Sequence, residues 1–309
     1  MSRIHEALKK AVEERSAQNV NRAAADLADL SIQEEIAGKV PVSGDAHANP
    51  RVAEKSDPGL LRFGEFAKLC RRVTWKIESD AGVHSAHSNN SVGAEKFRTL
   101  RSRLYQIASA QPLKRILITS STPAEGKTFV AANLARSFIR QENRRVLLID
   151  SDLRASRLHL HMGALETPGL SDYLRGDVDE YQVTQVEKDE NLFFIPGGRE
   201  VSNPSELLHS DRMKQLLGRM SLIFDWIILD SPPSLAVHDA SILADMCDGV
   251  LFVVRAGSTD FGLAAKASSE FHGKNLLGVV LNRVDKGDSY GGYYYGYGSH
   301  HEGDPKTKS

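Results

Sequence analysis

Cysteine is scarce in this sequence, with only Cys70 and Cys247 among 309 residues. The two lie far apart and lack the close spacing of metal ligands, which argues against a disulfide framework and against a zinc knuckle. Sparse, unpaired cysteine is typical of a reducing compartment, so we expect a cytoplasmic protein.

An excess of one charge is also lacking, because 39 Lys and Arg residues oppose 40 Asp and Glu residues. A chain with a net charge near zero has no global field to attract nucleic acid, and we predict no nucleic-acid partner. No run of about 18 consecutive apolar residues occurs, and the first residues have no apolar stretch of secretory type. We therefore expect this chain to reach a membrane only through a partner.

Short apolar, β-branched runs alternate with helical stretches after residue 93. This alternation predicts an α/β fold with a mostly parallel sheet and helices on both faces. Open parallel sheets bind ligands at the carboxyl edge of their strands, so the site is expected there. The predicted strands are residues 115–119, 145–149, 192–195, 226–229, 249–254 and 277–281.

The chain before residue 93 differs in composition and in the spacing of its apolar residues. Apolar residues recur at helical spacing near its start, which predicts an amphipathic helix that packs on its own domain or on another protein. Residues 40–59 and 81–93 are polar and rich in Gly, Ser and Asn, as linkers are, and residues 60–77 allow a further helix. We predict three parts: a peripheral helix and linker region (1–92), a core domain (93–285) and a flexible tail (286–309).

The segment SSTPAEGKTFVAANLA, residues 120–135, follows the first predicted strand. A Gly-rich turn that leads into a helix presents backbone N–H groups and the positive helix end to an anion, and Lys127 adds a full charge. In P-loop enzymes the hydroxyl at the position of Thr128 binds Mg²⁺. The first glycine of the general pattern is replaced by Ser121. The segment predicts a phosphate-binding loop.

Three carboxylates follow two other predicted strands. Asp150 and Asp152, in VLLIDSDLR, are two residues apart and point the same way in an extended segment, while Asp230 ends the strand of DWIILDSPPS. Carboxylates beside one site repel each other unless a cation lies between them. Together with the phosphate loop they predict a P-loop site for Mg²⁺ and a nucleoside triphosphate.

From about Val92 to its end the sequence resembles the bacterial tyrosine kinases of capsule and exopolysaccharide biosynthesis, specifically their stand-alone cytoplasmic type. The resemblance rests on TPAEGKTFVAANLA, LLIDSDLR, the Walker B element IILDSPPS with the residues after it, NPSELLHSDRMKQLL, and a tyrosine-rich tail. Ala124 and Ser156 depart from the family's frequent Gly and Pro. The family implies a protein-tyrosine autokinase that uses ATP and Mg²⁺ and regulates polymerisation and export of the polysaccharide.

The resemblance also implies roles for single residues. Asp150 is the first candidate for accepting the tyrosyl proton, although it and Asp152 could exchange roles, and Arg154 is expected to steady the transferred group or the subunit interface. The catalytic set is Lys127, Asp150, Asp152 and Arg154. The metal ligands are Thr128, Asp152 and Asp230. The nucleotide-binding residues are Ala124, Glu125, Gly126, Lys127, Thr128, Phe129 and Asn282.

Five of the eight tyrosines lie within eight residues of the tail, spaced by glycine. Such a segment makes a poor core and a poor strand, but it suits a mobile substrate. The family resemblance therefore implies autophosphorylation there; an aromatic interaction tail is the alternative. The tyrosines are Tyr290, Tyr293, Tyr294, Tyr295 and Tyr297.

The pattern E-x-x-R-x-x-R, carried by Glu95, Arg98 and Arg101, resembles the oligomerisation element of the family. The spacing of three keeps the charges on one side of a helix, as a solvated helix face also does. The resemblance implies a ring-like homo-oligomer that phosphorylates in trans, a membrane adaptor of the polysaccharide co-polymerase type and a cognate phosphotyrosine phosphatase.

Two other functions fit parts of the sequence. A switch ATPase like MinD or ParA shares this fold and these Asp clusters, but it carries an additional Lys near the start of the loop, where Thr122 stands here. A non-catalytic assembly module would use nucleotide only to set its oligomeric state.

Overall fold

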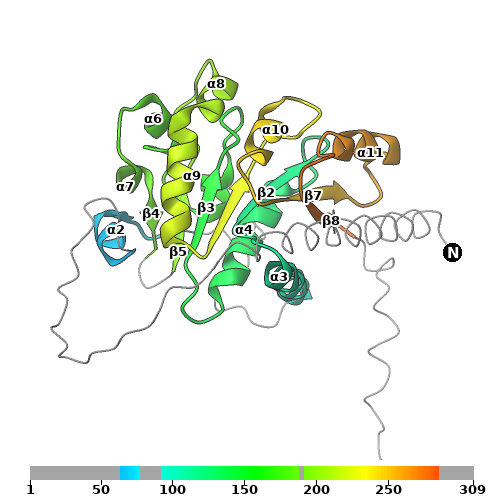
Figure 1. The fold of residues 1–309 in the computed structure, drawn as a ribbon, viewed down its shortest axis with the longest axis horizontal. Helices are drawn as coiled ribbons and strands as arrows, with labels where there is room; N and C mark the ends of the chain where they lie inside the picture. Colours follow the sequence, from blue (N-terminus) through cyan, green and yellow to red (C-terminus); the bar gives the residue numbers. More distant parts are fainter. Residues whose placement is uncertain (1–62, 77–91, 188–190, 285–309) are drawn as a thin grey trace, which may run out of the picture. The chain divides into compact units, whose positions relative to one another are not determined.

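The computed structural model describes residues 63–76, 92–187 and 191–284. They form one eight-stranded sheet in the order β1-β4-β5-β3-β6-β2-β7-β8 (Figure 1). The strands are β1 (Arg71–Arg72), β2 (Arg115–Ser120), β3 (Val146–Asp150), β4 (Gln185–Val186), β5 (Leu192–Ile195), β6 (Trp226–Asp230), β7 (Gly249–Arg255) and β8 (Leu276–Asn282). Neighbouring strands run parallel except β4 and β5. The predicted α/β fold is confirmed, and each predicted strand is present to within a residue at either end.

Helices connect the strands and cover both faces of the sheet. They are α2 (Phe63–Leu69), α3 (Val92–Ala110), α4 (Lys127–Ile139), α5 (Leu158–Met162), α6 (Leu170–Arg175), α7 (Glu180–Val183), α8 (Pro204–His209), α9 (Asp211–Ile223), α10 (Asp239–Ala244) and α11 (Phe261–Ser269). Because helices cover both faces, every residue of β3 and of β6 is buried, as expected for central strands written as continuous apolar runs.

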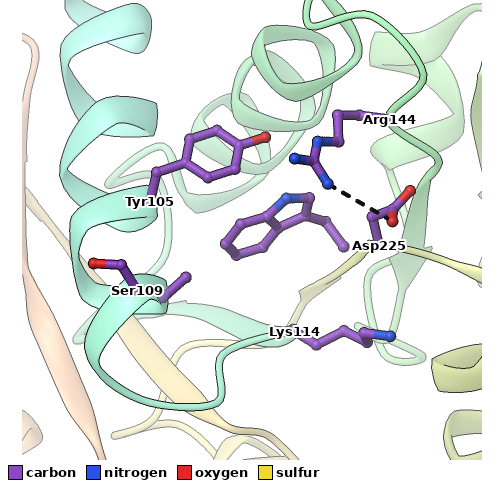
Figure 2. A pocket seen from close by; sticks show the side chains of 7 residues that line it. Tyr105, Ser109, Lys114, Arg144 and Asp225 are labelled. Carbon is purple, nitrogen blue, oxygen red and sulfur yellow. Dashed lines mark ion pairs between the residues drawn. The ribbon is translucent and has the colours of Figure 1, made fainter.

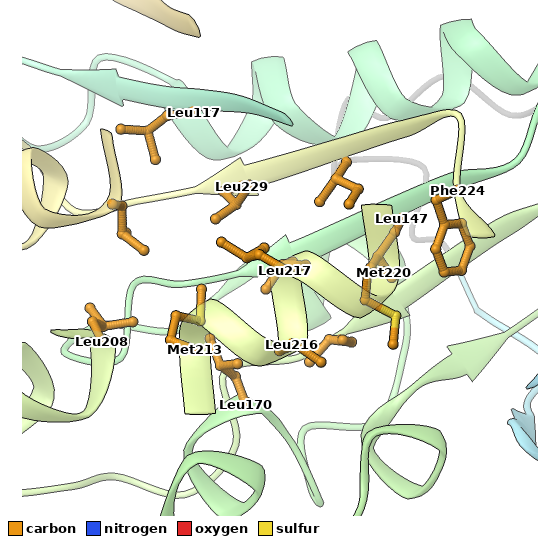
Figure 3. Packing of buried hydrophobic residues seen from close by; sticks show 14 of the residues in the cluster. Leu117, Leu147, Leu170, Leu208, Met213, Leu216, Leu217, Met220, Phe224 and Leu229 are labelled. Atoms are coloured by element: carbon orange, nitrogen blue, oxygen red, sulfur yellow. The ribbon is translucent and has the colours of Figure 1, made fainter. Parts of the chain in front are cut away.

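One face of the sheet packs against α9 (Figure 3). Met213, Leu216, Leu217 and Met220 are buried at the 3-1-3 spacing of one helix face. The helix begins after Ser210, whose hydroxyl oxygen accepts the N–H of Met213 at 3.4 Å, a typical N-cap contact. The apolar periodicity of the sequence thus decides how this helix lies on the sheet.

The opposite face packs against α4, and α3 packs outside α4. Residues Val130 to Phe138 of α4 are all buried. Phe138 stacks on Trp226 with ring centroids 4.3 Å apart, at the start of β6. Helix α4 therefore lies between the sheet and α3. This packing fixes the amino end of α4, where the predicted phosphate loop ends.

The prediction that residues before 93 lie outside the core is wrong for residues 63–76. The helix predicted over 60–77 is shorter, because the chain leaves it after Leu69 and pairs β1 with β4. Phe66 and Trp75 are buried in the two core clusters, and Phe66 packs edge-on to Phe224. These apolar side chains stand in a short segment between two polar linkers, and their burial depends on partners far along the chain. The amphipathic helix predicted near residue 4 lies outside the described residues.

The helices of the described ranges include none that is long and apolar enough to cross a membrane.

Replacing Phe66 by Ala tests whether residues 63–76 belong to the folded domain. Phe66 is 0% exposed, so the substitution removes a ring from the core and should lower the free energy of unfolding by about 3–5 kcal/mol. Urea unfolding of the full chain measures this loss. Lys68→Ala, on the exposed side of α2, is the control; equal stability of the two variants would contradict the core assignment.

Candidate active site

The ends of three adjacent parallel strands bring the predicted polar residues together. β2, β3 and β6 end at Ser120, Asp150 and Asp230, and Asp150 is the register partner of Asp230. Because the strands are parallel, the loops that follow them meet at one edge of the sheet. The tertiary structure therefore unites residues that lie up to 110 positions apart in the sequence.

The loop between β2 and α4 has the backbone of a phosphate cradle. Ala124 and Gly126 both have positive φ, 65° and 97°, the left-handed conformation that glycine adopts without strain. A Cβ on Gly126 would lie 1.9 Å from Nδ2 of Asn282, and the positive φ would strain any other residue, so this position favours glycine. Gly126 is the N-cap of the 13-residue helix α4, and the N–H groups at such a helix start can bind an anion.

Lys127 lies among the three carboxylates. Its Nζ is 3.1 Å from Oδ2 of Asp152 and 3.5 Å from the hydroxyl oxygen of Thr128. Burial lowers the pKa of Lys127, but the charges of Asp230, Asp152 and Asp150 together outweigh it and hold the pKa above its usual value. The lysine is a permanent cation at this edge.

Asp150 is 1% exposed and both of its oxygens accept hydrogen bonds. Oδ1 accepts the N–H of Asp152 at 3.2 Å, and Oδ2 accepts the Ser156 hydroxyl at 2.7 Å and the N–H of Leu158 at 3.1 Å. Burial and the charge of Asp230 raise its pKa to about 7, although the bonds from Ser156 and Leu158 act the other way. A carboxyl group with a pKa near neutral can exchange a proton at physiological pH.

Asp230 is a buried carboxylate whose surroundings suit a bound cation. Burial raises its pKa, while the charge of Lys127 and the Thr128 hydroxyl lower it. Its Oδ1 is buried and has no hydrogen-bond partner within the described ranges. A buried carboxylate oxygen without a partner is costly, and a metal ion at this position would remove that cost.

The oxygen set fits Mg²⁺. No group of three His, Cys, Asp or Glu side chains among the described residues could hold a metal by itself. Mg²⁺ does not need one, since it commonly takes one or two carboxylates together with phosphate and water oxygens. The residues that could hold it are Thr128, Asp152 and Asp230, as the sequence predicts.

Arg154 forms a contact that the sequence does not predict. Its Nε donates to Oδ2 of Asp239 at 2.8 Å and its Nη2 to the Ser205 hydroxyl at 2.8 Å. Asp239, in α10, is 0% exposed, and it also accepts the Ser205 hydroxyl. The guanidinium thus ties the loop after β3 to α8 and α10. The only signals were Ser205 within NPSELL and Asp239 within LAVHDAS.

Three residues predicted to bind nucleotide have other contacts in the structure. The Glu125 side chain is buried inside the loop, and Asn282 donates its side-chain N–H to the Glu125 carbonyl at 2.9 Å. Phe129 packs edge-on to Phe97 of α3 at 5.9 Å. The backbone N–H groups of the loop remain as the predicted phosphate contacts, whereas an adenine contact by Asn282 stays a prediction.

The predicted oligomerisation residues interact within the chain. Arg98 pairs with Glu95 at 2.6 Å on α3. Arg101 turns inward and donates to the carbonyl of Ser137 near the end of α4. Burial lowers its pKa. The five tail tyrosines lie outside the described residues.

A cavity of about 340 Å³ lies at the other edge of the sheet (Figure 2). Trp226 is the first residue of β6 and Lys114 precedes β2, so the cavity is at the amino ends of the strands. Its lining is Tyr105, Ala108, Ser109, Lys114, Arg144, Asp225 and Trp226. It is separate from the carboxylates and the phosphate loop.

The chain has clear relatives among known proteins. The domain described as CobQ/CobB/MinD/ParA nucleotide binding domain matches residues 116–305. Tyrosine-protein kinase YwqD of Bacillus subtilis is 37% identical over 210 residues, which are 67% of this chain and 87% of YwqD. This chain belongs to the bacterial tyrosine kinase family. The kinase family predicted from the motifs is thereby confirmed.

Other relatives agree. Tyrosine-protein kinase CpsD of Streptococcus pneumoniae is 36% identical to this kinase over 62% of the chain and 86% of CpsD. Longer relatives, such as tyrosine-protein kinase wzc of Salmonella typhimurium, are matched over 29% of their length. The solved kinase domain of Escherichia coli tyrosine kinase ETK is 32% identical with a TM-score of 0.62 and covers 75% of this chain and 88% of its own. These matches favour the kinase over the alternative of a switch ATPase.

Asp150 should give the nucleotide-free kinase a recognisable pH dependence. Its carboxyl group has an ordinary pKa of 3.8 and keeps its proton to about pH 7 in the folded chain. Between these values the folded state binds more protons than the unfolded state, so the free energy of unfolding falls as the pH rises. Asp150→Asn cannot titrate, and its stability should fall less steeply in urea unfolding between about pH 5 and about pH 7.

Asp211→Asn is the matched control, because it makes the same change at a side chain that is 84% exposed. Its slope should match that of the wild type. Identical slopes for Asp150→Asn and the wild type would show that Asp150 loses its proton at its ordinary pKa.

Proposed function

We propose that this kinase transfers the γ-phosphoryl group of ATP to the tyrosines of its own C-terminal tail, in trans between subunits. The observation that carries the proposal is the meeting of Lys127 with Asp150, Asp152 and Asp230 at the carboxyl edge of the sheet. Phosphoryl transfer needs positive charge on the phosphates and a group that accepts the proton of the attacking hydroxyl. Both are available at this edge.

The geometry supports the following residues for MgATP. Backbone N–H groups of residues 124–127 would hold the phosphates, and Thr128, Asp152 and Asp230 would hold Mg²⁺. When bound, the ion supplies charge neutralisation for the β and γ phosphates. Lys127 is paired with Asp152 in the structure. With the carboxylates neutralised by a cation, its ammonium group is available to the phosphates.

Asp150 is the proposed acceptor of the tyrosyl proton, with Asp152 as the alternative. A tyrosine hydroxyl has a pKa near 10, so a base with a pKa of about 7 and a nearby cation both favour the transfer. The Ser156 hydroxyl and the N–H of Leu158 orient the Asp150 carboxyl group. Arg154, held by Asp239, would position the loop that carries Asp152.

The biological setting follows from the resemblance to capsule and exopolysaccharide kinases. The kinase would act in the cytoplasm at the inner face of the membrane, recruited there by an adaptor of the polysaccharide co-polymerase type. Glu95, Arg98 and Arg101 would support a ring of subunits, which brings the tail of one copy to the site of the next. A phosphotyrosine phosphatase would reverse the modification, and the cycle would regulate polymer export.

Lys127→Met should abolish autophosphorylation. It removes the cation that offsets phosphate charge but keeps an unbranched side chain in the partly buried position. Phosphotyrosine immunoblotting after incubation of the full chain with MgATP and an adaptor fragment measures the loss. Lys214→Met, on the exposed face of α9, should keep the wild-type signal; phosphotyrosine on Lys127→Met would contradict the assigned site.

Changing all five tail tyrosines to Phe should remove most of the phosphotyrosine and leave nucleotide binding intact, because the tail is proposed as substrate only. Phosphopeptide mapping and calorimetric titration with MgADP measure the two effects. Label that persists on Tyr105, Tyr173 or Tyr181 at the wild-type level would show that the tail is not the main acceptor.

A further inference from the structure

Glu125 is an unexpected residue in a loop that binds anions. It lies two positions before Lys127, yet a carboxylate near a triphosphate is repelled by it. The structure resolves this conflict, because the Glu125 side chain points into the protein and is 2% exposed. A buried carboxylate is costly unless hydrogen bonds compensate it, so its partners indicate what it does.

The Glu125 carboxylate accepts hydrogen bonds from three residues. The Ser121 hydroxyl lies 2.9 Å from Oε1 and 3.0 Å from Oε2, and the N–H of Thr122 lies 2.8 Å from Oε2. These contacts close the loop on itself, with Ser121 at the position where the general pattern has its first glycine. The third donor is the hydroxyl of Thr259, which is 134 residues away in the sequence.

Thr259 is itself fixed by the end of β7. Its hydroxyl oxygen accepts the N–H of Arg255 at 3.2 Å, and its own N–H donates to the Arg255 carbonyl at 3.1 Å. Asn282, at the end of β8, makes a second link. Its side-chain N–H donates to the Glu125 carbonyl, and its backbone carbonyl accepts the N–H of Ala256 at 2.9 Å. The phosphate loop is therefore tied to two strands on the side away from Asp150 and Asp152.

We infer that buried Glu125 and partly buried Thr259 form a clamp that sets the shape of the phosphate loop, which makes Thr259 a positioning residue for nucleotide binding. The loop needs such support, because Ala124 holds a left-handed conformation that a non-glycine residue rarely adopts. A charged acceptor is suited to the task, since hydrogen bonds to ionised groups are shorter and stronger than neutral ones.

The inference rests on the proposed function, because it assigns a role in binding the nucleotide of that reaction. It adds a residue from the turn between β7 and α11, a part of the chain in which the sequence predicts no site residue. It also gives Glu125 a structural role through its side chain, distinct from the backbone contact predicted for it.

The test is calorimetric titration of the full-length chain with MgADP, using two variants of one residue. Thr259→Val keeps the shape of the side chain but loses the hydroxyl, and should weaken MgADP binding by about tenfold, the effect of one lost hydrogen bond on loop position. Thr259→Ser keeps the hydroxyl and should restore affinity to within about twofold of the wild type. In kinase assays Thr259→Val should raise KM for ATP more than it lowers kcat, since phosphate contacts act in both ground and transition states.

A control and a double variant separate the outcomes. Ser268→Ala removes a hydroxyl that bonds within α11 only and should bind MgADP like the wild type. If the two residues act as a unit, Glu125→Gln with Thr259→Val should lose less affinity than the sum of the single changes. Wild-type affinity in Thr259→Val, or a loss that Thr259→Ser does not restore, would overturn the clamp. Failure of the wild type to bind MgADP would instead overturn the proposed function.

Discussion

The concentration of negative charge around Lys127 is the constraint on which the site depends. Asp150 and Asp230 are neighbours across β3 and β6, both are buried, and the charge of Asp230 raises the cost of ionising Asp150. The fold tolerates this because one lysine is buried among them. A site with this excess of negative charge can bind a divalent cation. Burial and the charge of Asp230 also keep the pKa of Asp150 near neutral, which suits a proton acceptor.

Two sets of contacts hold this arrangement from opposite sides. On one side Arg154 ties the loop after β3 to Asp239 and Ser205, so that helices α8 and α10 support the loop of Asp152. On the other side Glu125, Thr259 and Asn282 tie the phosphate loop to β7 and β8. In each set a buried carboxylate, Asp239 or Glu125, accepts several hydrogen bonds. Burying a carboxylate costs free energy, so the arrangement is stable only while all of its donors are present. Both loops are therefore held by contacts within the chain, without any bound nucleotide.

Much of this protein could be predicted from its sequence. The strands of the core domain follow from short apolar runs bounded by turn residues, and the phosphate loop from a glycine and lysine directly before a helix. The sequence predicts Asp150, Asp152 and Asp230 as site residues because they lie at the ends of such strands, and parallel strands end at one edge. The segment of residues 63–76 was misplaced, since a two-residue strand such as β1 has no periodicity and its burial depends on partners far along the chain.

The sequence by itself determined the fold class and the chemistry of the site, because hydrophobic periodicity and the residues at strand ends are local properties. Only the tertiary structure decided which side chains hold that chemistry in place. Thr259 carries no local signal, and Asp239 and Ser205 are marked only by the family segments that contain them. Glu125 and Arg101 turn inward although their positions allowed an outward role. Hydrogen bonds between residues more than a hundred positions apart, such as that from Thr259 to Glu125, depend on how the chain packs. No spacing along the sequence encodes them.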